Sequence, residues 1–437
     1  MSARPFRVVA AVALVGAGAL ILSGCSAPIE ERANATPAHV VTIEGPITDH
    51  DADLLSASWA SWEKANNITI LYTGTPDFES SIATEAQENN APDLAIIAQP
   101  GIVVDLAQHN LLQPLPSSVM SNVTKNFPSD WAKYTSSGSS DYAAPLLASV
   151  NGWVFYSPAQ FAKWGVSVPK TWDQLLALTQ TIEEKTGSAP WCDGFSQGAT
   201  SGENGVGWID DLVLRRAGAK VYDEWVDHQI PFTDKHIQAA FGDASKILLN
   251  PKYVNAGIGG VSSINDATTP RVASALESGQ CALTRQPSSF VNQLTTASGK
   301  QASIKPGGDY WAFPLPPITA GSTPVTGGGY FVSAFSKKAD VIKVQQYLSS
   351  SAWAKSRVAL GGAISPDLSL SASLDSTPLE QASTRILQDK KTVFRFDAAD
   401  LMPAVVGSGT FLTGMGDWIK GSSTTSVLKD INLSWPN

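Results

Sequence analysis

Two carboxylates and several aromatic side chains lie close together near the end of the chain. Asp397 and Asp400 are three residues apart in the segment 394–418, which also contains Phe394, Phe396, Phe411 and Trp418. A pair of carboxyl groups can act as the acid and base of a glycoside hydrolase. Carboxylates beside aromatic rings can equally hold a sugar through its hydroxyl groups and its apolar face. The segment therefore indicates carbohydrate chemistry, either cleavage or binding.

The spacing of the two aspartates argues against cleavage. The carboxyl groups of a hydrolase lie about 5 to 5.5 Å apart in retaining enzymes and about 6.5 to 9.5 Å apart in inverting ones, on opposite sides of the bond that breaks. Asp397 and Asp400 belong to one local segment. We therefore expect Asp400 to accept hydrogen bonds from a ligand, and hydrolysis by Asp397 and Asp400 remains the alternative.

Three other short segments carry polar groups that could bind a ligand. Asp210 follows Trp208 at a predicted helix start, where its charge either stabilises the helix N-terminus or contacts a ligand. Arg285 and Gln286 follow a short apolar run and offer several donors, either to sugar hydroxyls or to an interdomain salt bridge. The glycines at 327–329 either expose backbone N–H groups to a ligand or form a plain turn.

Motifs of common enzymes and cofactor sites are missing or lack their context. Gly194–Gly198 reads G-x-S-x-G, but no buried strand precedes it, and we interpret it as a loop. The sequence has no H-E-x-x-H, no C-x-x-C and no G-x-x-x-x-G-K-[ST] pattern, and Gly407-Ser408-Gly409 lacks the third glycine of a dinucleotide site. We predict no metal, no cofactor and no enzymatic activity.

The elements that must position these residues alternate between strand and helix. Strand-like runs lie at 39–45, 68–74 and 93–101, helical patterns lie at 51–66 and 78–88, and a helix followed by a turn lies at 102–115. This alternation favours a mainly parallel sheet covered by helices on both faces.

A second group of elements follows a break in that alternation. Two strand-like runs within 142–158 meet near 149–151, which predicts a first crossover between two domains. About 400 residues are too many for one ordinary core and suit two domains. Further helices are predicted at 171–185, 207–216, 231–250 and 340–360, and strands at 307–318 and 327–335.

The N-terminal residues have the pattern of an export signal. Arg4 and Arg7 precede an apolar run at 8–22, too short for a typical membrane span. The run ends in Leu-Ser-Gly-Cys25, which resembles a bacterial lipobox and implies cleavage after residue 24 and a lipid on Cys25. The polar segment 25–38 has no apolar period, and we therefore expect a flexible tether there. The alternative is an ordinary secretory signal with an incidental cysteine.

Charge and cysteine content restrict the partners and the redox setting. A net charge of -9 argues against nucleic acid, which calls for basic patches. Cys192 and Cys281 remain after Cys25 is set aside, and an even pair in an exported protein indicates a disulfide. Such a bond closes a loop of about 90 residues and contributes roughly 4 to 5 kcal/mol to stability. Two buried free thiols are the alternative.

The order and spacing of these segments resemble a known family. The chain is similar to the extracellular solute-binding proteins of sugar ABC transporters, family 1, and is most similar to their α-glucoside-binding branch. The resemblance lies in the segments 72–101, 152–179, 189–194, 207–232, 281–290, 326–331 and 394–403.

The resemblance implies an α/β fold of two lobes, the type II periplasmic-binding-protein fold. Each lobe would be a mainly parallel sheet flanked by helices, with the ligand cleft between the lobes. The first lobe would comprise 39–150 and about 312–370, and the second 151–311 and about 371–437.

The resemblance also implies which residues line the cleft. Thr75, Asp77 and Gln99 follow predicted strands, at the strand ends where open α/β sheets bind ligands. The other cleft positions of the family are occupied here by Trp208, Arg285, Gln286, Gly328, Gly329 and Asp400.

The sequence departs from the branch at Ser201-Gly202-Glu203, where Thr-Gly-Trp is usual. Glu203 puts a charge in the place of an aromatic platform, so that it either marks a more polar ligand or makes no contact.

The implied function is capture and delivery of a carbohydrate. A receptor of this family closes its lobes on an α-glucoside or related oligosaccharide and passes it to the permease subunits of an ABC importer. We expect a monomer that is anchored through Cys25 to the outer face of the cytoplasmic membrane.

Overall fold

The computed structural model describes residues 39–296 and 298–436. The predicted signal, the tether and Cys25 lie outside the described residues. Among the helices that are described, none is both long enough and apolar enough to cross a bilayer.

The first sheet has five strands in the order β2-β1-β3-β11-β6. It comprises β1 (Val40–Gly45), β2 (Thr69–Gly74), β3 (Leu94–Ile97), β6 (Ala143–Ala148) and β11 (Gly329–Ala334). β1 pairs in parallel with β2 and β3, whereas β11 is antiparallel to both β3 and β6. All residues of β3 and β6 are buried, which explains their continuous apolar sequences.

The second sheet has three strands in the order β8-β7-β9. Its strands are β7 (Trp153–Tyr156), β8 (Leu283–Gln286) and β9 (Trp311–Pro314), and β7 is antiparallel to both neighbours. The mainly parallel pairing expected for each lobe is therefore wrong for this sheet, and the first sheet is mixed, with two parallel and two antiparallel strand pairs. The chain leaves β7 through several helices before β8 begins, so no single right-handed β-α-β crossover fixes the strand direction.

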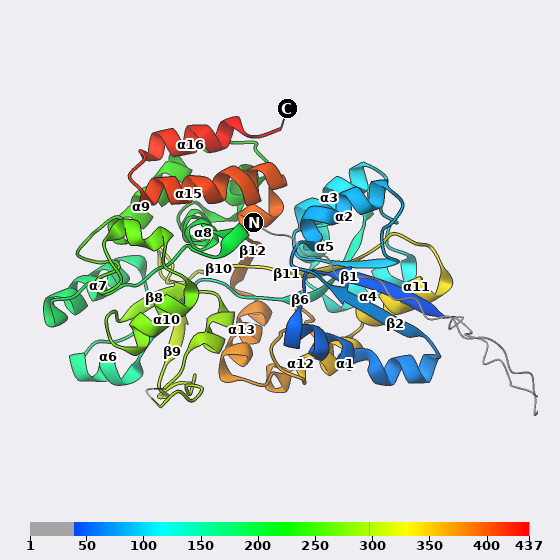
Figure 1. The fold of residues 1–437 in the computed structure, drawn as a ribbon, viewed down its shortest axis with the longest axis horizontal. Helices are drawn as coiled ribbons and strands as arrows, with labels where there is room; N and C mark the ends of the chain where they lie inside the picture. The colour runs from blue at the N-terminus through cyan, green and yellow to red at the C-terminus, as the bar shows by residue number, and fades with distance from the viewer. Residues whose placement is uncertain (1–38, 297, 437) are drawn as a thin grey trace, which may run out of the picture. The chain divides into compact units, whose positions relative to one another are not determined.

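Helices surround both sheets, which gives the two-lobed α/β fold that the sequence predicts (Figure 1). Around the first sheet lie α1 (Asp49–Asn66), α2 (Phe78–Gln87), α3 (Pro100–Gln108), α4 (Ser117–Asn126), α5 (Ser129–Lys133), α11 (Ala339–Leu348) and α12 (Ser351–Val358). Around the second lie α6 (Pro158–Trp164), α7 (Trp172–Thr186), α8 (Glu203–Val226), α9 (Lys235–Leu248), α10 (Thr269–Glu277), α15 (Leu412–Ile419) and α16 (Thr424–Leu433).

Shorter elements complete the described chain. They are the strands β4 (Ser136–Ser137), β5 (Ser140–Asp141), β10 (Thr323–Gly327) and β12 (Thr392–Phe396), the helices α13 (Pro378–Gln388) and α14 (Ala398–Leu401), the 3-10 turns η1 (Gly198–Thr200), η2 (Val261–Asn265), η3 (Ser288–Gln293) and η4 (Ala372–Leu374), and the π-helical turn η5 (Val405–Phe411).

Most predicted elements are confirmed, and one helix is not. The helix predicted at 340–360 is two helices, α11 and α12, separated after Leu348. Ser350 lies in an extended conformation and its hydroxyl accepts a hydrogen bond from the backbone N–H of Trp353. This N-cap starts a new helix and competes with continuation of the first one.

Three segments from distant parts of the sequence lie side by side between the two sheets. The loop that joins β6 to β7 is hydrogen-bonded to β10 and to the turn after it, through Ser149 N–H to Gly328 O at 2.8 Å and Asn151 N–H to Thr326 O at 2.9 Å. β10 pairs in parallel with β12, and Asp397 N–H donates to Gly327 O at 2.8 Å. Figure 1 shows β10 and β12 at this central position.

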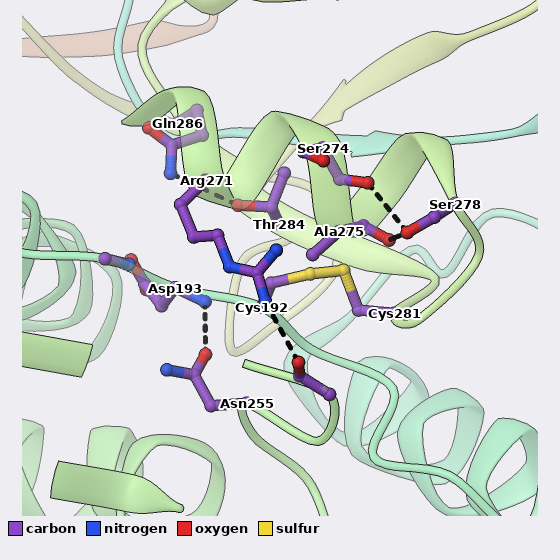
Figure 2. Close-up of a disulfide and its surroundings, with 12 residues drawn as sticks. Cys192, Asp193, Asn255, Arg271, Ser274, Ala275, Ser278, Cys281, Thr284 and Gln286 are labelled. Carbon is purple, nitrogen blue, oxygen red and sulfur yellow. Dashed lines mark hydrogen bonds between the residues drawn. A yellow bond between two sulfur atoms is a disulfide. The ribbon is translucent and has the colours of Figure 1, made fainter. Parts of the chain in front are cut away.

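The structure contains the Cys192–Cys281 disulfide, whose Cα atoms are 5.7 Å apart (Figure 2). Both cysteines are buried. Next to Cys192, the backbone N–H of Asp193 donates to Asn255 Oδ1 at 2.8 Å. Cys281 lies two residues before β8, which carries Arg285 and Gln286, so the disulfide ties this strand to the segment before α8.

Candidate functional site

A cavity of about 50 Å³ lies where α8, β8 and the residues after β12 meet. Four carboxyl groups and one guanidinium line it. The lining residues are Asn151, Glu203, Asn204, Val206, Gly207, Asp210, Arg285, Pro287, Asp397, Ala399 and Asp400.

A buried ion-pair network fixes the guanidinium at the cavity wall. Arg285 Nε and Nη2 lie 2.8 and 2.6 Å from Asp211 Oδ2, and Arg215 Nη1 lies 2.5 Å from Asp211 Oδ1. Thr326 of β10 also donates to Asp211 Oδ1, at 2.8 Å. Gly152 in the crossover has φ of +72° and packs on the Asp211 carboxylate, where a Cβ atom would clash. The network thus joins α8, β8 and two crossover segments.

Two carboxylate oxygens in this region are buried without a hydrogen-bond partner. Asp210 is fully buried; its Oδ2 accepts from Ala398 N–H at 2.9 Å, while its Oδ1 has no partner. Asp397 Oδ2 accepts from Asn151 Nδ2 at 2.5 Å, while its Oδ1 has no partner. Because a buried acceptor without a partner costs about 1 to 3 kcal/mol, these two atoms are candidates for ligand contacts.

Burial shifts the acidity of these groups upward. It raises the pKa of Asp397 to about 7, although the Arg285 charge opposes the shift. Burial and the nearby charge of Asp397 raise the pKa of both Asp210 and Asp400 well above the ordinary range. In contrast, Asp211 keeps a lowered pKa, because Arg215 and Arg285 together outweigh its burial.

The structure brings four of the predicted site residues together. Asp210, Arg285 and Asp400 line the cavity. Gly328 lies beside it, since a Cβ atom there would be 3.9 Å from Asp400 Oδ2. The Gly328 N–H already donates to Ser149 Oγ at 3.0 Å.

Two further predicted residues lie behind the cavity wall. Trp208 is fully buried, its Nε1 donates to Asp193 Oδ2 at 2.6 Å, and the Arg285 guanidinium lies 5.9 Å from its ring centroid. Gln286 Oε1 accepts from Asn204 Nδ2 at 3.2 Å. These side chains support Arg285 and Asn204, which do line the cavity.

The remaining predicted residues are not part of this cavity lining. Thr75 and the exposed Asp77 lie in the loop between β2 and α2. Gln99, at the N-terminus of α3, donates through Nε2 to Ser408 Oγ at 3.2 Å. Gly329 packs in β11, where a Cβ atom would meet the Trp131 ring at 3.1 Å.

Prediction from sequence missed several residues that line the cavity. Asn151 lies in the crossover that the sequence predicts, but a single amide there has no recognisable pattern. Asn204 follows Glu203, a residue for which the sequence allows either contact with a ligand or no contact. Glu203 is an exposed residue that lines the cavity at the start of α8. The Glu203 carboxylate, which replaces the usual tryptophan of the α-glucoside-binding branch, therefore faces the candidate site.

The first lobe contacts the segment that carries Asp400. A Cβ atom at Gly101 of α3 would lie 2.9 Å from Met402 O and 3.2 Å from Asp400 O. Glu79 of α2 accepts from Ala98 N–H at 2.8 Å, and its charge contributes to the raised pKa of Asp400. Groups from both lobes therefore act on the same site.

A two-lobed α/β fold with a polar cavity beside its crossover segments is the architecture of type II solute-binding proteins. The chain belongs to the bacterial extracellular solute-binding protein family, whose model matches residues 43–355. The family predicted from sequence is thereby confirmed.

Two relatives match nearly the whole chain. The osmoprotective compounds-binding protein GgtB of Synechocystis sp. is 31% identical over 427 residues, covering 95% of this chain and 97% of the relative. The alpha-glucosides-binding periplasmic protein AglE of Rhizobium meliloti is 30% identical over 405 residues, covering 90% of this chain and 86% of the relative.

Solved structures show the same fold. The bacterial solute receptor AcbH superposes with a TM-score of 0.72 at 18% identity, over 90% of this chain and 97% of that one. RafE in complex with raffinose gives a TM-score of 0.67 at 16% identity, over 90% of this chain and 98% of that one. The family and these neighbours are binding proteins.

Proposed function

We propose that the protein is a carbohydrate receptor that delivers its ligand to an ABC importer. The observation that carries this proposal is the pair of unpartnered carboxylate oxygens, Asp210 Oδ1 and Asp397 Oδ1, at a cavity in a chain of the solute-binding family. AglE, named as an alpha-glucosides-binding protein, is similar over 90% of this chain and supports an α-glucoside or a related oligosaccharide as ligand.

The chemistry of the cavity suits hydroxyl donors. Each sugar hydroxyl can donate one hydrogen bond, and acceptors that are buried away from water favour such a donor strongly. Asp210, Asp397, Asp400 and the Asn204 amide oxygen supply acceptors, since the Asn204 NH2 group already donates to Gly194 O and Gln286 Oε1, and Arg285 supplies donors for other hydroxyl oxygens. We propose that these five residues contact the ligand.

Entry of a sugar requires the lobes to separate. The cavity has room for a few water molecules, well below the roughly 300 to 1,000 Å³ of ordinary small-molecule sites. We propose that the lobes open at the crossover segments 149–152, 327–328 and 396–397, as in other hinge motions. Thr75, Asp77, Gln99, Trp208, Gln286, Gly328 and Gly329 remain proposed parts of the binding region in that open form.

We propose lobe boundaries close to those predicted. The first lobe comprises 39–150 and the part of the chain that contains β11, α11 and α12; the second comprises 151–314, three residues beyond the predicted limit of 311, and the C-terminal region. β9 pairs with β7, which supports placing the return to the first lobe after Pro314.

The hydrolase alternative is less well supported. A carboxyl pair that cleaves sugars needs one ionised and one protonated group, set by environments that push their pKa values apart. Burial raises the pKa of both Asp397 and Asp400. We propose that the protein binds carbohydrate without cleaving it.

We also propose export and lipid anchoring. The support is the sequence pattern alone: a basic start, an apolar run at 8–22 and the lipobox-like ending at Cys25. The mature chain would be a monomer held by its lipid on the outer face of the cytoplasmic membrane, beside the permease subunits. Mass spectrometry of the protein from membranes checks this, and an unmodified Cys25 would contradict it.

A thermal-shift screen with mono- and disaccharides tests the receptor function. A sugar at 100 times its dissociation constant is expected to raise the free energy of unfolding by about 2.7 kcal/mol. Assay of released reducing sugar under the same conditions separates binding from hydrolysis. A panel in which no sugar stabilises the protein would refute the proposal.

A further inference from the structure

The charges at the cavity do not balance. Four carboxyl groups line it, from Glu203, Asp210, Asp397 and Asp400. The cation in the lining is Arg285, and its guanidinium is already bound to Asp211. Arg215 and Arg285 both pair with the Asp211 carboxylate. These three groups together carry one net positive charge, whereas the cavity lining contains four acids. The cavity can therefore accommodate further positive charge.

The acids come from separate elements that converge on the cavity. Glu203 and Asp210 lie on α8, and Asp397 and Asp400 lie between β12 and the end of α14. Glu79 of α2 adds another carboxylate from the first lobe, and its charge acts on Asp400. Such a convergence of like charges is unfavourable unless the groups take up protons or a cation neutralises them.

Two atoms show that the cluster lacks a partner. Asp210 is completely buried, and its Oδ1 has no hydrogen bond. Asp397 Oδ1, from the opposite segment, is also buried without one. Each atom can accept a hydrogen bond from a donor placed in the cavity.

We propose that the ligand is a carbohydrate that carries a protonated amine, and that the ammonium group binds among Glu203, Asp210, Asp397 and Asp400. The proposal rests on the proposed receptor function and specifies its substrate class. An ammonium group has three donors and no acceptor, which matches a site of carboxylate oxygens.

Other ligand charges fit this site less well. A phosphorylated or acidic sugar would meet four acids and a guanidinium that is already paired. Among residues 39–296 and 298–436, no three His, Cys, Asp or Glu side chains are arranged to hold a metal ion. A neutral sugar satisfies the two free oxygens but supplies no positive charge, so that the acids must be neutralised by protons. The raised pKa values of Asp210 and Asp400, caused first by burial, agree with acids that lack a counter-charge.

Isothermal titration calorimetry with matched sugars tests the proposal. The probes are methyl α-glucoside and maltose, each compared with derivatives in which one hydroxyl is replaced by an amine. Charge-assisted hydrogen bonds are stronger than neutral ones, so at least one amine should bind about tenfold or more tightly than its parent. Ethanolamine supplies an amine without a sugar ring and should bind far more weakly.

Two variants locate the ammonium group. Glu203→Gln, and separately Asp400→Asn, should reduce the preference for the amine by about tenfold. Glu88→Gln, at the exposed end of α2, is the matched control and should leave the affinity for both members of each pair unchanged. If either site variant fails to fold, the other and the wild-type comparison still decide the result.

The possible outcomes distinguish failure of the amine proposal from failure of the proposed receptor function. Binding of the neutral parents with no gain for any amine overturns the amine proposal and leaves the receptor function intact. If ethanolamine binds as tightly as the amine-bearing sugars, the proposal that the ligand is a carbohydrate is overturned. If neither the parents, their amines nor any sugar of the thermal-shift panel binds, both proposals fail.

Discussion

Asp211 is the residue on which the interior of the site depends most. It is completely buried and is the shared carboxylate of Arg215 and Arg285. Asp211→Asn leaves two buried guanidinium groups without a counter-charge, so the free energy of unfolding should fall by about 3 to 5 kcal/mol. Urea unfolding measures the change. Asp53→Asn, at an exposed position of α1, is the control, and an equal loss of stability in both variants would contradict the role of Asp211.

Substitution of Asp400 should have the opposite effect from substitution of Asp211: it should weaken ligand binding and leave stability unchanged. Its carboxyl lines the cavity, and burial together with Asp397 raises its pKa. Asp400→Ala is therefore expected to weaken sugar binding by about tenfold to a hundredfold, the value of a charged hydrogen bond, without lowering stability. Titration calorimetry and urea unfolding check both parts. Unchanged affinity would remove Asp400 from the site.

Acidity at the cavity also predicts how stability depends on pH. Burial raises the pKa of Asp397 to about 7, so between its ordinary pKa of 3.8 and about 7 the folded protein holds a proton that the unfolded chain releases. This contribution to stability is complete below the lower value and is lost as pH rises through the upper one. Asp193, whose pKa burial also raises to about 7, acts in the same direction.

The free energy of unfolding of the ligand-free protein should therefore be higher at pH 5.5 than at pH 7.5. Urea unfolding at several pH values measures it, and Asp397→Asn should flatten the dependence. Stability that rises with pH across this range would contradict the burial of these carboxyls.

At the scale of elements, the Cys192–Cys281 bond is the main covalent restraint in the described chain. It links residues 89 apart in sequence, and Cys281 lies two residues before β8. Replacing both cysteines by serine should lower the free energy of unfolding by roughly 4 kcal/mol, chiefly because the unfolded chain gains freedom. Denaturation of the oxidised protein and of the double variant tests this. A loss below about 1 kcal/mol would show that the loop restraint contributes little.

Local patterns predicted the elements better than their pairing. β3 and β6 were recognisable because every residue in them is buried. The antiparallel pairing of β7 with β8 and β9 depends on contacts between residues more than 120 positions apart, which no local pattern contains. The break between α11 and α12 depends on one serine hydroxyl at Ser350.

The residues of the candidate site could likewise be predicted only in part from the sequence. Arg285 and Asp400, which the family resemblance implies, and Asp210, which its place at a helix start suggests, line the same cavity, and each is a charged group in a distinctive segment. Their contact with a ligand stays a prediction. Asn151 and Asn204 were missed because a single amide in a loop or at a helix start has no sequence signature. Trp208 is a core residue, which its type alone does not distinguish from a sugar platform.

For the whole molecule, the proposed closure requires a close approach between α3 and the segment after β12. A Cβ atom at Gly101 would already lie 2.9 Å from Met402 O. Gly101→Leu should hold the lobes apart, lower sugar affinity by about tenfold or more, and prevent the decrease in radius of gyration that we expect the ligand to cause, which X-ray scattering would measure. Gly242→Leu, on an open face of α9, is the control. Normal closure of the Gly101 variant would contradict the proposed motion.

The position of β11 has a consequence for how the chain is made. β11 lies between β3 and β6 in the first sheet, yet it begins only at Gly329. A nascent chain that has not reached this point can pair β1 with β2 and β3, but β6 has no neighbour in that sheet. Formation of the sheet therefore waits until more than 330 residues have been synthesised. The translating ribosome, and any export machinery behind it, handles a chain that is still incompletely folded.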